Sequence, residues 1–370
     1  MGWAKDSGMD LDARVSYIRR VGEEIITEKE LRTLLETKDH PTAYDGFEPS
    51  GLAHLPFGVL RPILVEDMLK AGVHMKLWIA DWFAWVNNKM GGDLAKIQEV
   101  GRYFVEVWKA AGVDMTKVEV LWTSDAARQE EYWKKVVTVA QNSTLARAQR
   151  ALTIAGRTTK ESVQTAALFY PMMQVADIFW LDVDICQLGV DQRRANILAR
   201  EIAEKLKWKK PVAVHHHMLI GLQGRKEPEG FDENGAMDSE IASKMSKSKP
   251  ETSIFVHDSS EVIMKKVNSA YCPPKIVEGN ALLEYSRYII FRKQKALSIE
   301  RAEKYGGNVE FTSPEELEKA FLAGSLHPAD LKKGVGHALD EIIAPIRDHF
   351  EKDPHARRLY EAVRTAETTR

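Results

Sequence analysis

Two short apolar runs, Met75–Asp81 (MKLWIAD) and Val118–Ser124 (VEVLWTS), decide the fold class of this sequence. Each run has the length and apolar continuity of a buried strand. Between them, Asp93 begins a pattern of apolar residues at helical spacing that ends near Gly112. This strand–helix–strand alternation predicts an α/β fold, with a doubly wound parallel sheet covered by helices on both faces.

A third strand is expected at Thr42–Phe47 (TAYDGF), which ends in turn residues. In open parallel sheets, ligands bind beyond the carboxyl ends of the strands. Tyr44, Asp81 and Ser124 each come at the end of an expected strand. The sequence therefore predicts that these three polar side chains lie near one rim of the sheet.

The remainder of the chain is expected to be mostly helical. Near the N-terminus, Thr27 and Glu30 form a capping-box pattern at the start of the second of two expected helices. From about Val262 the pattern is helical, and one long amphipathic helix is expected between His327 and Pro354. We expect three parts: a helical segment at residues 1–38, an α/β domain at 39–262 and a helical domain at 263–370.

The bulk composition excludes several classes of protein. The formal net charge of the 370 residues is −2, which argues against wholesale wrapping of nucleic acid but not against local binding. The two cysteines, Cys186 and Cys272, are too few for a disulfide framework and have no partner at a metal-ligand spacing. The sequence begins without an apolar run, so we expect no signal peptide and no membrane anchor, and a cytoplasmic enzyme is the default.

One stretch, Tyr132–Lys160, carries basic residues and no acidic ones. Its cations are Lys134, Lys135, Arg147, Arg150, Arg157 and Lys160. A solvated helical face and a local contact with nucleic acid both account for this pattern, and the residues alone leave the choice open.

The segment Ala242–Pro250 (ASKMSKSKP) interleaves lysines and serines directly before a proline. Such runs are often plain surface loops. They can also serve as a mobile clamp, because ammonium and hydroxyl groups on a flexible strip can bind a polyphosphate.

Two further stretches of the sequence favour the interpretation of this segment as a phosphate-binding clamp. Tyr44–Gly58 (YDGFEPSGLAHLPFG) reads as a strand, a glycine-containing turn and a helix that starts near His54, a geometry that offers backbone N–H groups to phosphate. In the second stretch, Tyr170, Gln174 and Asp177 are spaced four and three apart, so they share one helix face. Polar groups on such an apolar helix are expected to converge on a polar ligand or to be capped internally.

Together these motifs resemble the tyrosyl-tRNA synthetases of the archaeal and eukaryotic branch, which are class I aminoacyl-tRNA synthetases. The resemblance runs from roughly Val21 to Phe350. His54–Phe57 (HLPF) stands where the class has its HIGH signature, and Lys244–Ser248 reproduces KMSKS in full. The resemblance implies a Rossmann-like catalytic domain, a helical anticodon-binding domain, and activation of L-tyrosine by ATP, with Mg²⁺, before transfer to tRNA(Tyr).

The resemblance also implies roles for individual residues. Tyr44 and Asp177 would bind the phenolic hydroxyl of tyrosine, although Tyr44 could also be core and Asp177 could cap a loop. The other residues expected around the amino acid are Tyr170, Gln174 and Gln192 at its α-amino group and Trp78, Ala80 and Phe83 along the pocket. Those expected at ATP are Gly46, His54, Lys244, Met245, Ser246, Lys247 and Ser248, with His54, Lys244 and Lys247 as the catalytic groups.

The signature is incomplete, because Pro56 and Phe57 replace its glycine and second histidine. Proline is tolerated in a first helical turn, but phenylalanine cannot donate a hydrogen bond to phosphate. Two alternatives stay open: a tryptophanyl-tRNA synthetase, which shares the fold and signatures, and a catalytically inactive synthetase fold that binds RNA, which only Phe57 supports.

Contacts with tRNA are implied at four residues. Tyr305 and His327 would stack on the first anticodon base, Asp330 would accept hydrogen bonds from a guanine edge, and Arg193 would contact the first acceptor pair. A plain helix N-terminus is the alternative explanation of the His-Pro-x-Asp pattern. An insertion at about residues 130–168 would form the interface of a homodimer.

The run His215–His217 suggests a metal site at first sight. Adjacent histidines point in different directions, and no further ligand follows at a useful spacing. We expect a structural role with a possible ATP contact, and no metal site.

Overall fold

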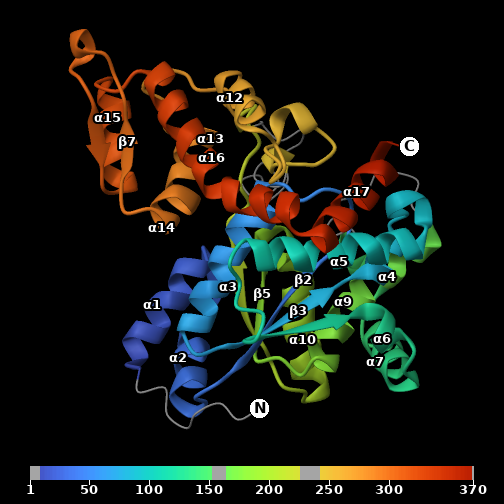
Figure 1. Ribbon diagram of the computed structural model, residues 1–370. Helices are drawn as coiled ribbons and strands as arrows, with labels where there is room; N and C mark the ends of the chain where they lie inside the picture. Colours follow the sequence, from blue (N-terminus) through green and yellow to red (C-terminus); the bar gives the residue numbers. More distant parts are fainter. Residues whose placement is uncertain (1–8, 152–163, 226–241, 369–370) are drawn as a thin grey trace.

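The computed structural model describes residues 9–151, 164–225 and 242–368. Within these residues, an α/β body carries a helical part on one side (Figure 1). The central sheet has the strand order β1-β6-β5-β2-β3-β4, in which β1 is antiparallel to β6 and the other pairs are parallel. The strands are β1 (Glu24–Ile26), β2 (Thr42–Phe47), β3 (His74–Ile79), β4 (Val118–Trp122), β5 (Ile185–Gly189) and β6 (Val212–His216).

Helices cover both faces of this sheet, which confirms the predicted fold class. They are α1 (Leu11–Val21), α2 (Glu28–Thr37), α3 (Arg61–Lys70), α4 (Asp81–Val86), α5 (Leu94–Ala110), α6 (Thr123–Ala127), α7 (Glu130–Gln141), α8 (Leu145–Ala151), α9 (Phe169–Trp180) and α10 (Arg193–Leu206). Their apolar sides form two separate cores, because successive strand residues point to opposite faces. Ala43 of β2 belongs to the core with α1, α3 and α5, whereas Tyr44 belongs to the core with α7, α9 and α10.

The start signals read from the sequence are present at the expected helices. The Asp93 carboxylate accepts hydrogen bonds from the backbone N–H groups of Ala95 and Lys96 at the start of α5. Thr27 and Glu30 form a complete capping box at the start of α2. Each cap satisfies N–H groups that have no partner inside the helix.

The C-terminal part is helical but contains an unexpected hairpin. Its helices are α12 (Ser260–Asn268), α13 (Ala281–Tyr285), α14 (Phe291–Lys293), α15 (Pro314–Ala323), α16 (Pro328–Lys352) and α17 (Pro354–Thr368). The hairpin pairs β7 (Leu297–Ile299) with β8 (Val309–Phe311) in antiparallel fashion. Strands of three residues are too short for their alternation to stand out in a sequence.

Both ends of the described chain pack onto the α/β body. Strand β1 extends the sheet beside β6, and α17 returns to lie along α5 (Figure 1). Tyr360 of α17 stacks on His257 with 4.0 Å between the ring centroids. The division at residues 38/39 and 262/263 stays a prediction, since the outer segments share cores with the central one. None of the described helices has the length and apolar character that spanning a bilayer requires.

The expected grouping of Tyr44, Asp81 and Ser124 at one rim is wrong in part. Tyr44 lies inside β2 rather than at its end. The Asp81 carboxylate is buried and accepts hydrogen bonds from the Ser124 backbone N–H and from Gln98, at 3.0 Å each. Asp81 and Ser124 therefore join α4, α5 and α6 to one another instead of facing the cavity that Tyr44 lines.

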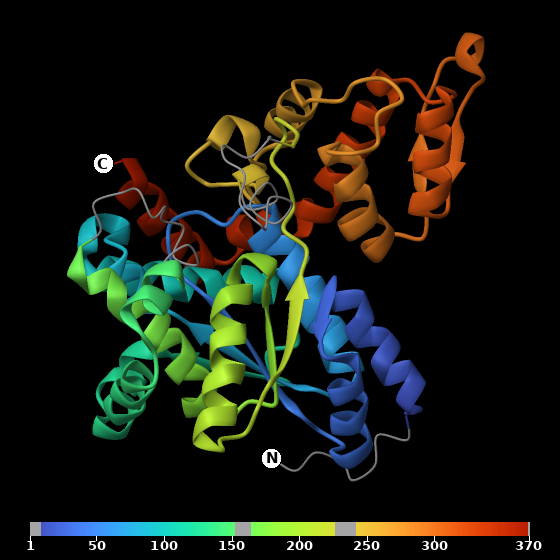
Figure 2. The same cartoon turned by 180° about the vertical axis from the view of Figure 1, so that it is seen from behind.

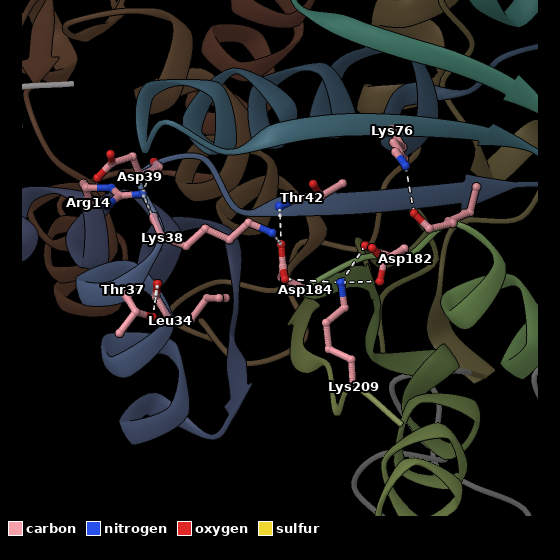
Figure 3. A network of polar contacts seen from close by, with 11 residues as sticks. Arg14, Leu34, Thr37, Lys38, Asp39, Thr42, Lys76, Asp182, Asp184 and Lys209 are labelled. Carbon is pink, nitrogen blue, oxygen red and sulfur yellow. Dashed lines mark hydrogen bonds and ion pairs between the residues drawn. The ribbon is translucent and has the colours of Figure 1, made fainter. Parts of the chain in front are cut away.

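A polar network fastens the opposite, amino-terminal end of the sheet (Figure 3). The buried Asp184 carboxylate accepts hydrogen bonds from the Thr42 backbone N–H and the Lys38 ammonium, each at 2.7 Å, and Lys209 lies 3.4 Å away. The Asp184 backbone N–H donates to the Thr42 carbonyl, and its own carbonyl accepts from Val212. One residue thus ties the starts of β2, β5 and β6 together.

We predict that Asp184→Asn lowers the free energy of unfolding at pH 7 by about 1.5–3 kcal/mol, the usual value of hydrogen bonds to a charged group. Burial acts to raise the pKa of Asp184, but the Lys38 and Thr42 hydrogen bonds and the Lys209 charge outweigh it and lower the pKa. The stabilisation is therefore present above the unfolded pKa of about 4 and is lost as pH falls through the lower folded value.

Urea unfolding of both proteins between pH 3 and pH 7 measures this difference. Asp182→Asn is the matched control, because the exposed Asp182 side chain also pairs with Lys209, at 2.6 Å. We expect it to change stability by less than about 0.5 kcal/mol. If the loss of unfolding free energy caused by Asp184→Asn stays constant with pH, the assignment of a negative charge to the folded Asp184 carboxylate is contradicted.

Candidate active site

A cavity of about 900 Å³ opens at the carboxyl ends of β2, β5 and β6. Strand β2 pairs with β3 on one side and with β5 on the other, so the cavity lies where the chain connections diverge, the usual ligand site of such sheets. The lining includes every residue expected at tyrosine or ATP: Tyr44, Gly46, His54, Trp78, Ala80, Phe83, Tyr170, Gln174, Asp177, Gln192, Lys244, Met245, Ser246, Lys247 and Ser248.

Asp177 forms the centre of a buried cluster at one end of the cavity. One carboxylate oxygen accepts a hydrogen bond from the Tyr132 hydroxyl and the other from the Trp78 indole N–H, both at 2.8 Å. Burial raises the pKa of Asp177 well above its usual value, while these two hydrogen bonds oppose the shift. The carboxyl is held in one orientation and keeps acceptor capacity for a third group.

Tyr44 lies beside this cluster with its ring buried on β2. Its hydroxyl has no hydrogen-bond partner within the residues that the structure describes. Burial raises the pKa of Tyr44 well above its usual value, so the hydroxyl keeps its proton. A buried hydroxyl without a partner costs free energy, and a polar group of a ligand in the cavity would remove that cost.

A second cluster of polar side chains lines the neighbouring wall of the cavity. The Gln174 amide donates to the Gln192 side-chain oxygen at 2.9 Å, and the Tyr170 hydroxyl donates to the Glu48 carboxylate. Glu48 also accepts from Asn87 at 2.8 Å. This wall therefore combines a carboxylate with amide oxygens, which are acceptors suited to an ammonium group.

The KMSKS segment closes the opposite end. Lys244 forms an ion pair with Asp191, with 2.8 Å between Nζ and Oδ2, and that charge raises the pKa of Lys244. Backbone hydrogen bonds from Met245 to Leu219 and from Gly221 to Ser243 join the segment to the chain that leaves β6 (Figure 2). These hydrogen bonds therefore restrain the backbone that carries the lysines, although this backbone is a loop.

The HLPF segment lies beneath these lysines. Burial, together with the charges of Lys247, Arg61 and Lys244, lowers the pKa of His54 well below its usual value, so the imidazole is neutral. A π-helical turn at Pro56–Leu60 follows and leads into α3. Gly58 is required here, because a Cβ atom would lie 2.4 Å from the Val256 side chain.

Three residues of the site were not predicted from the sequence: Tyr132, Glu48 and Asp191. Glu48 lies inside Tyr44–Gly58 and Asp191 directly precedes Gln192, so their position next to expected ligands was an available signal. Tyr132 lies 45 residues before Asp177 on another helix, and no spacing rule connects the two. Only the packing of α7 against α9 brings them together.

The residues expected at tRNA lie away from the cavity. The Arg193 guanidinium donates to both carboxylate oxygens of Glu24 at 2.9 Å, and Glu24 also contacts His215 at 2.8 Å. In the basic stretch, Lys134 pairs with Glu130 and Glu131. Arg157 and Lys160 lie outside the described residues.

The two expected anticodon elements are neighbours in the helical part. The Arg301 guanidinium donates to the carbonyls of Gly307 and Ser325, which joins the turn after Tyr305 to the start of α16. Tyr305 is 62% exposed. His327 caps α16, since its Nδ1 accepts from the Ala329 N–H at 3.1 Å, and Asp330 follows in the first turn. His327 is therefore the N-cap of α16, and base readout stays a prediction.

The three histidines at the carboxyl end of β6 have separate partners. His216 bonds Gln187 at 2.8 Å, and burial lowers its pKa to about 3. His217 lies between two carboxylates, Glu23 at 3.1 Å and Glu284 at 3.0 Å, and stacks on Tyr288. Burial acts to lower the pKa of His217, but both carboxylates outweigh it and raise the pKa to about 10. Within the described ranges, no group of three or more His, Cys, Asp or Glu side chains is arranged to hold a metal ion.

Comparisons with known proteins agree with this geometry. The family model described as tRNA synthetases class I (W and Y) matches residues 36–344. A cytoplasmic tyrosine–tRNA ligase of Arabidopsis thaliana is 46% identical over 364 residues, covering 98% of this chain and 90% of that protein. A tyrosine–tRNA ligase of Saccharolobus islandicus is 46% identical over 350 residues, covering 94% and 96%. The crystal structure of tyrosyl-tRNA synthetase complexed with L-tyrosine from Pyrococcus horikoshii has a TM-score of 0.88 and 39% identity, covering 96% of this chain and all of that one.

The fold and the cavity thus define a class I aminoacyl-tRNA synthetase. Within that class the chain belongs to the tyrosine–tRNA ligase family, so it is an enzyme of the aminoacyl-tRNA ligase type. The resemblance inferred from HLPF and KMSKS is confirmed, and the replacement of the second histidine by Phe57 does not place the chain outside the family.

We predict that His217→Gln destabilises the protein in a pH-dependent way, because it removes an imidazolium held by Glu23 and Glu284. The folded pKa of about 10 exceeds the unfolded value of about 6.5, so the stabilisation is complete below pH 6.5 and is lost as pH rises through 10. At pH 6 the loss should be about 1.5–3 kcal/mol.

Chemical unfolding of the wild type and of His217→Gln between pH 6 and pH 10 tests this prediction. His337→Gln, a single histidine change on α16, is the control for substitution of a histidine elsewhere. If the difference in free energy of unfolding between the wild type and His217→Gln does not decrease toward pH 10, the charged state of His217 is refuted.

Proposed function

We propose that this enzyme activates L-tyrosine with ATP to form tyrosyl-adenylate and pyrophosphate, and then transfers tyrosine to the 3′-terminal adenosine of tRNA(Tyr). The observation that carries the proposal is the buried Tyr44 hydroxyl, which lacks a partner within the described residues and lies in a cavity shared with Asp177. A substrate phenol would bond both groups. Phenylalanine would leave them unpaired, and burial makes that loss large.

The wall with Gln174, Gln192 and Glu48 would bind the α-amino group. Its acceptors fit an ammonium ion, and Tyr170 orients Glu48 through its hydroxyl. Trp78, Ala80 and Phe83 are buried and line the space between the two polar ends. The amino acid would therefore lie with its ring against apolar side chains and its carboxylate toward the nucleotide.

Adenylate formation needs charge stabilisation rather than a covalent catalyst. A tyrosine carboxylate oxygen attacks the α-phosphorus of ATP, a new P–O bond forms, and the bond to the bridging oxygen breaks to release pyrophosphate. Lys244 and Lys247 would bind the negative charge that develops on the phosphates, and His54 would contribute a neutral hydrogen-bonding group. Gly46 and the KMSKS residues Met245, Ser246 and Ser248 line the same end.

Mg²⁺ would enter as part of the substrate, because it binds mainly to phosphates and keeps several waters. Among the described residues at the nucleotide end, Asp191 already pairs with Lys244, and Asp258 pairs with Lys266 at 2.7 Å. We therefore assign no reaction step to a protein-bound ion.

A homodimer and a cytoplasmic location complete the proposal. Large apolar side chains on four neighbouring helices are exposed: Trp85, Val137, Leu145 and Phe169. Exposed apolar groups of this size mark interaction surfaces. Val137 and Leu145 lie within residues 130–168, and Phe169 directly follows them, where the sequence predicts the interface. Arg193 and the basic Tyr132–Lys160 stretch would then serve the acceptor stem, and the relative from Arabidopsis is named as cytoplasmic.

We predict tyrosine-dependent exchange between ATP and pyrophosphate, with little exchange when phenylalanine or tryptophan replaces tyrosine. Exchange measured with radiolabelled pyrophosphate decides between the alternatives. A tryptophan-specific signal would indicate a tryptophanyl-tRNA synthetase. Retained tRNA binding without any exchange would indicate an inactive RNA-binding protein.

Tyr44→Phe in the same exchange assay tests whether the buried Tyr44 hydroxyl binds the substrate phenol. Loss of one hydrogen bond in a buried site should reduce discrimination against phenylalanine roughly five- to a hundredfold, with the KM for ATP nearly unchanged. Tyr271→Phe, a change of the same kind on a half-exposed residue outside the cavity, should have no effect. Equal discrimination in Tyr44→Phe and wild type would remove the basis of the proposal for the phenol.

We also predict that Asp330→Ala leaves exchange intact but weakens aminoacylation of tRNA. The guanine edge would lose an acceptor worth about 1–3 kcal/mol of discrimination. A tRNA already altered at the first anticodon base should suffer little further loss, which makes the comparison a double-mutant cycle with one partner made of RNA. Additive penalties in the aminoacylation assay would mean that Asp330 only favours the start of α16.

A further inference from the structure

Phe57, which stands in the place of the second signature histidine, belongs to an aromatic cluster in the cavity wall. Its ring centroid lies 4.0 Å from that of Phe104 and 5.1 Å from that of Phe47. Phe57 and Phe104 are both buried and both line the cavity. Phenyl rings have no hydrogen-bond donor for a phosphate, but their faces carry partial negative charge. This wall therefore attracts a cation rather than an anion.

A cation lies on that wall. The Lys247 ammonium is 4.5 Å from the centroid of Phe104 and 5.9 Å from that of Phe57. Both distances fall within the range of an effective cation–π contact. The same ammonium is 3.3 Å from the Ser50 hydroxyl, in the turn that follows β2. Lys247 is thus held between the aromatic wall and the turn, at the nucleotide end of the cavity.

We propose that Phe57 and Phe104 form an aromatic seat that positions Lys247 for adenylate formation. The inference rests on the proposed function and assigns to Phe57 a role that acts through the lysine. An ammonium has three N–H donors, and contact with ring faces occupies only one side of it. The remaining donors stay available to phosphate oxygens while the rings hold the group in place.

The physical benefit of the seat is preorganisation. A lysine side chain has four rotatable bonds, and fixing it during the reaction costs conformational entropy. The seat restricts Lys247 before ATP binds, so that cost no longer adds to the barrier. A histidine at position 57 would bind phosphate directly, whereas Phe57 exchanges that hydrogen bond for control over the neighbouring lysine.

The test is a double-mutant cycle between the seat and the lysine. Single-turnover adenylate formation is measured at saturating tyrosine for the wild type, F104L, K247M and the double variant F104L/K247M. We expect F104L to slow the reaction roughly three- to thirtyfold while changing the KM for tyrosine less than twofold. In the K247M background, F104L should have almost no further effect, because the cation that the ring positions is absent.

A conservative replacement separates the charge of the ring face from its shape. Trifluorophenylalanine at position 104 keeps the ring and its packing but withdraws electron density from the face, so we expect a loss close to that of F104L in the wild-type background alone. F350L is the matched control for lost aromatic packing, since Phe350 is also buried and contacts the α5 residue Tyr103 but does not itself line the cavity. F350L should change thermal stability with adenylate formation nearly unaltered.

Three results would overturn the proposal. Additive losses in F104L/K247M would show that the ring acts without Lys247. Faster reaction in F104L would show that the rings retain the lysine away from ATP. Full activity with trifluorophenylalanine would show that shape alone matters. If the wild type shows no tyrosine-dependent exchange, the proposed function is refuted as well. An active wild type with additive losses in F104L/K247M would refute only the aromatic seat.

Discussion

The pairing of β2 with β5 is the contact on which the active site depends. Only Ala43 with Ile185 and Tyr44 with Cys186 are in register there, and Asp184 fastens the start of the pairing through Thr42 and Lys38. Because connections leave β2 toward β3 and enter β5 from the far edge of the sheet, the crevice above this seam is open. Asp177 and the KMSKS lysines both line that crevice.

Burial and charge divide the cavity into two ends with different chemistry. At one end, the buried Asp177 cluster and Tyr44 offer directional hydrogen bonds in a site of low polarity. At the other end, positive charge comes from Lys244 and Lys247, whereas burial leaves His54 and His216 neutral. Cations there are restrained by Asp191 and by aromatic rings, so they can serve phosphate without large reorganisation.

Local rules predicted most elements, because the determining information lies within a few residues. The Asp93 cap, the capping box at Thr27 and the apolar runs of β3 and β4 each depend on neighbours in sequence. Short elements without a strong period were missed, among them β1 and the β7–β8 hairpin. Asp81 and Ser124 lie just beyond the ends of their strands as expected, but a strand-end rule cannot distinguish a side chain that faces a ligand from one that joins two helices.

The sequence by itself determined the fold class, the family and the residues around the cavity, because HLPF, KMSKS and the spacing of Tyr170, Gln174 and Asp177 are local patterns with a defined chemistry. Only the tertiary structure decided what holds those residues in position. Tyr132 reaches Asp177 from another helix, Asp191 reaches Lys244 across the crevice, and Phe104 reaches Lys247 from α5. These partners are far apart in the chain, and side-chain contacts at such separations are set by the packing of helices on the sheet, which no local pattern encodes.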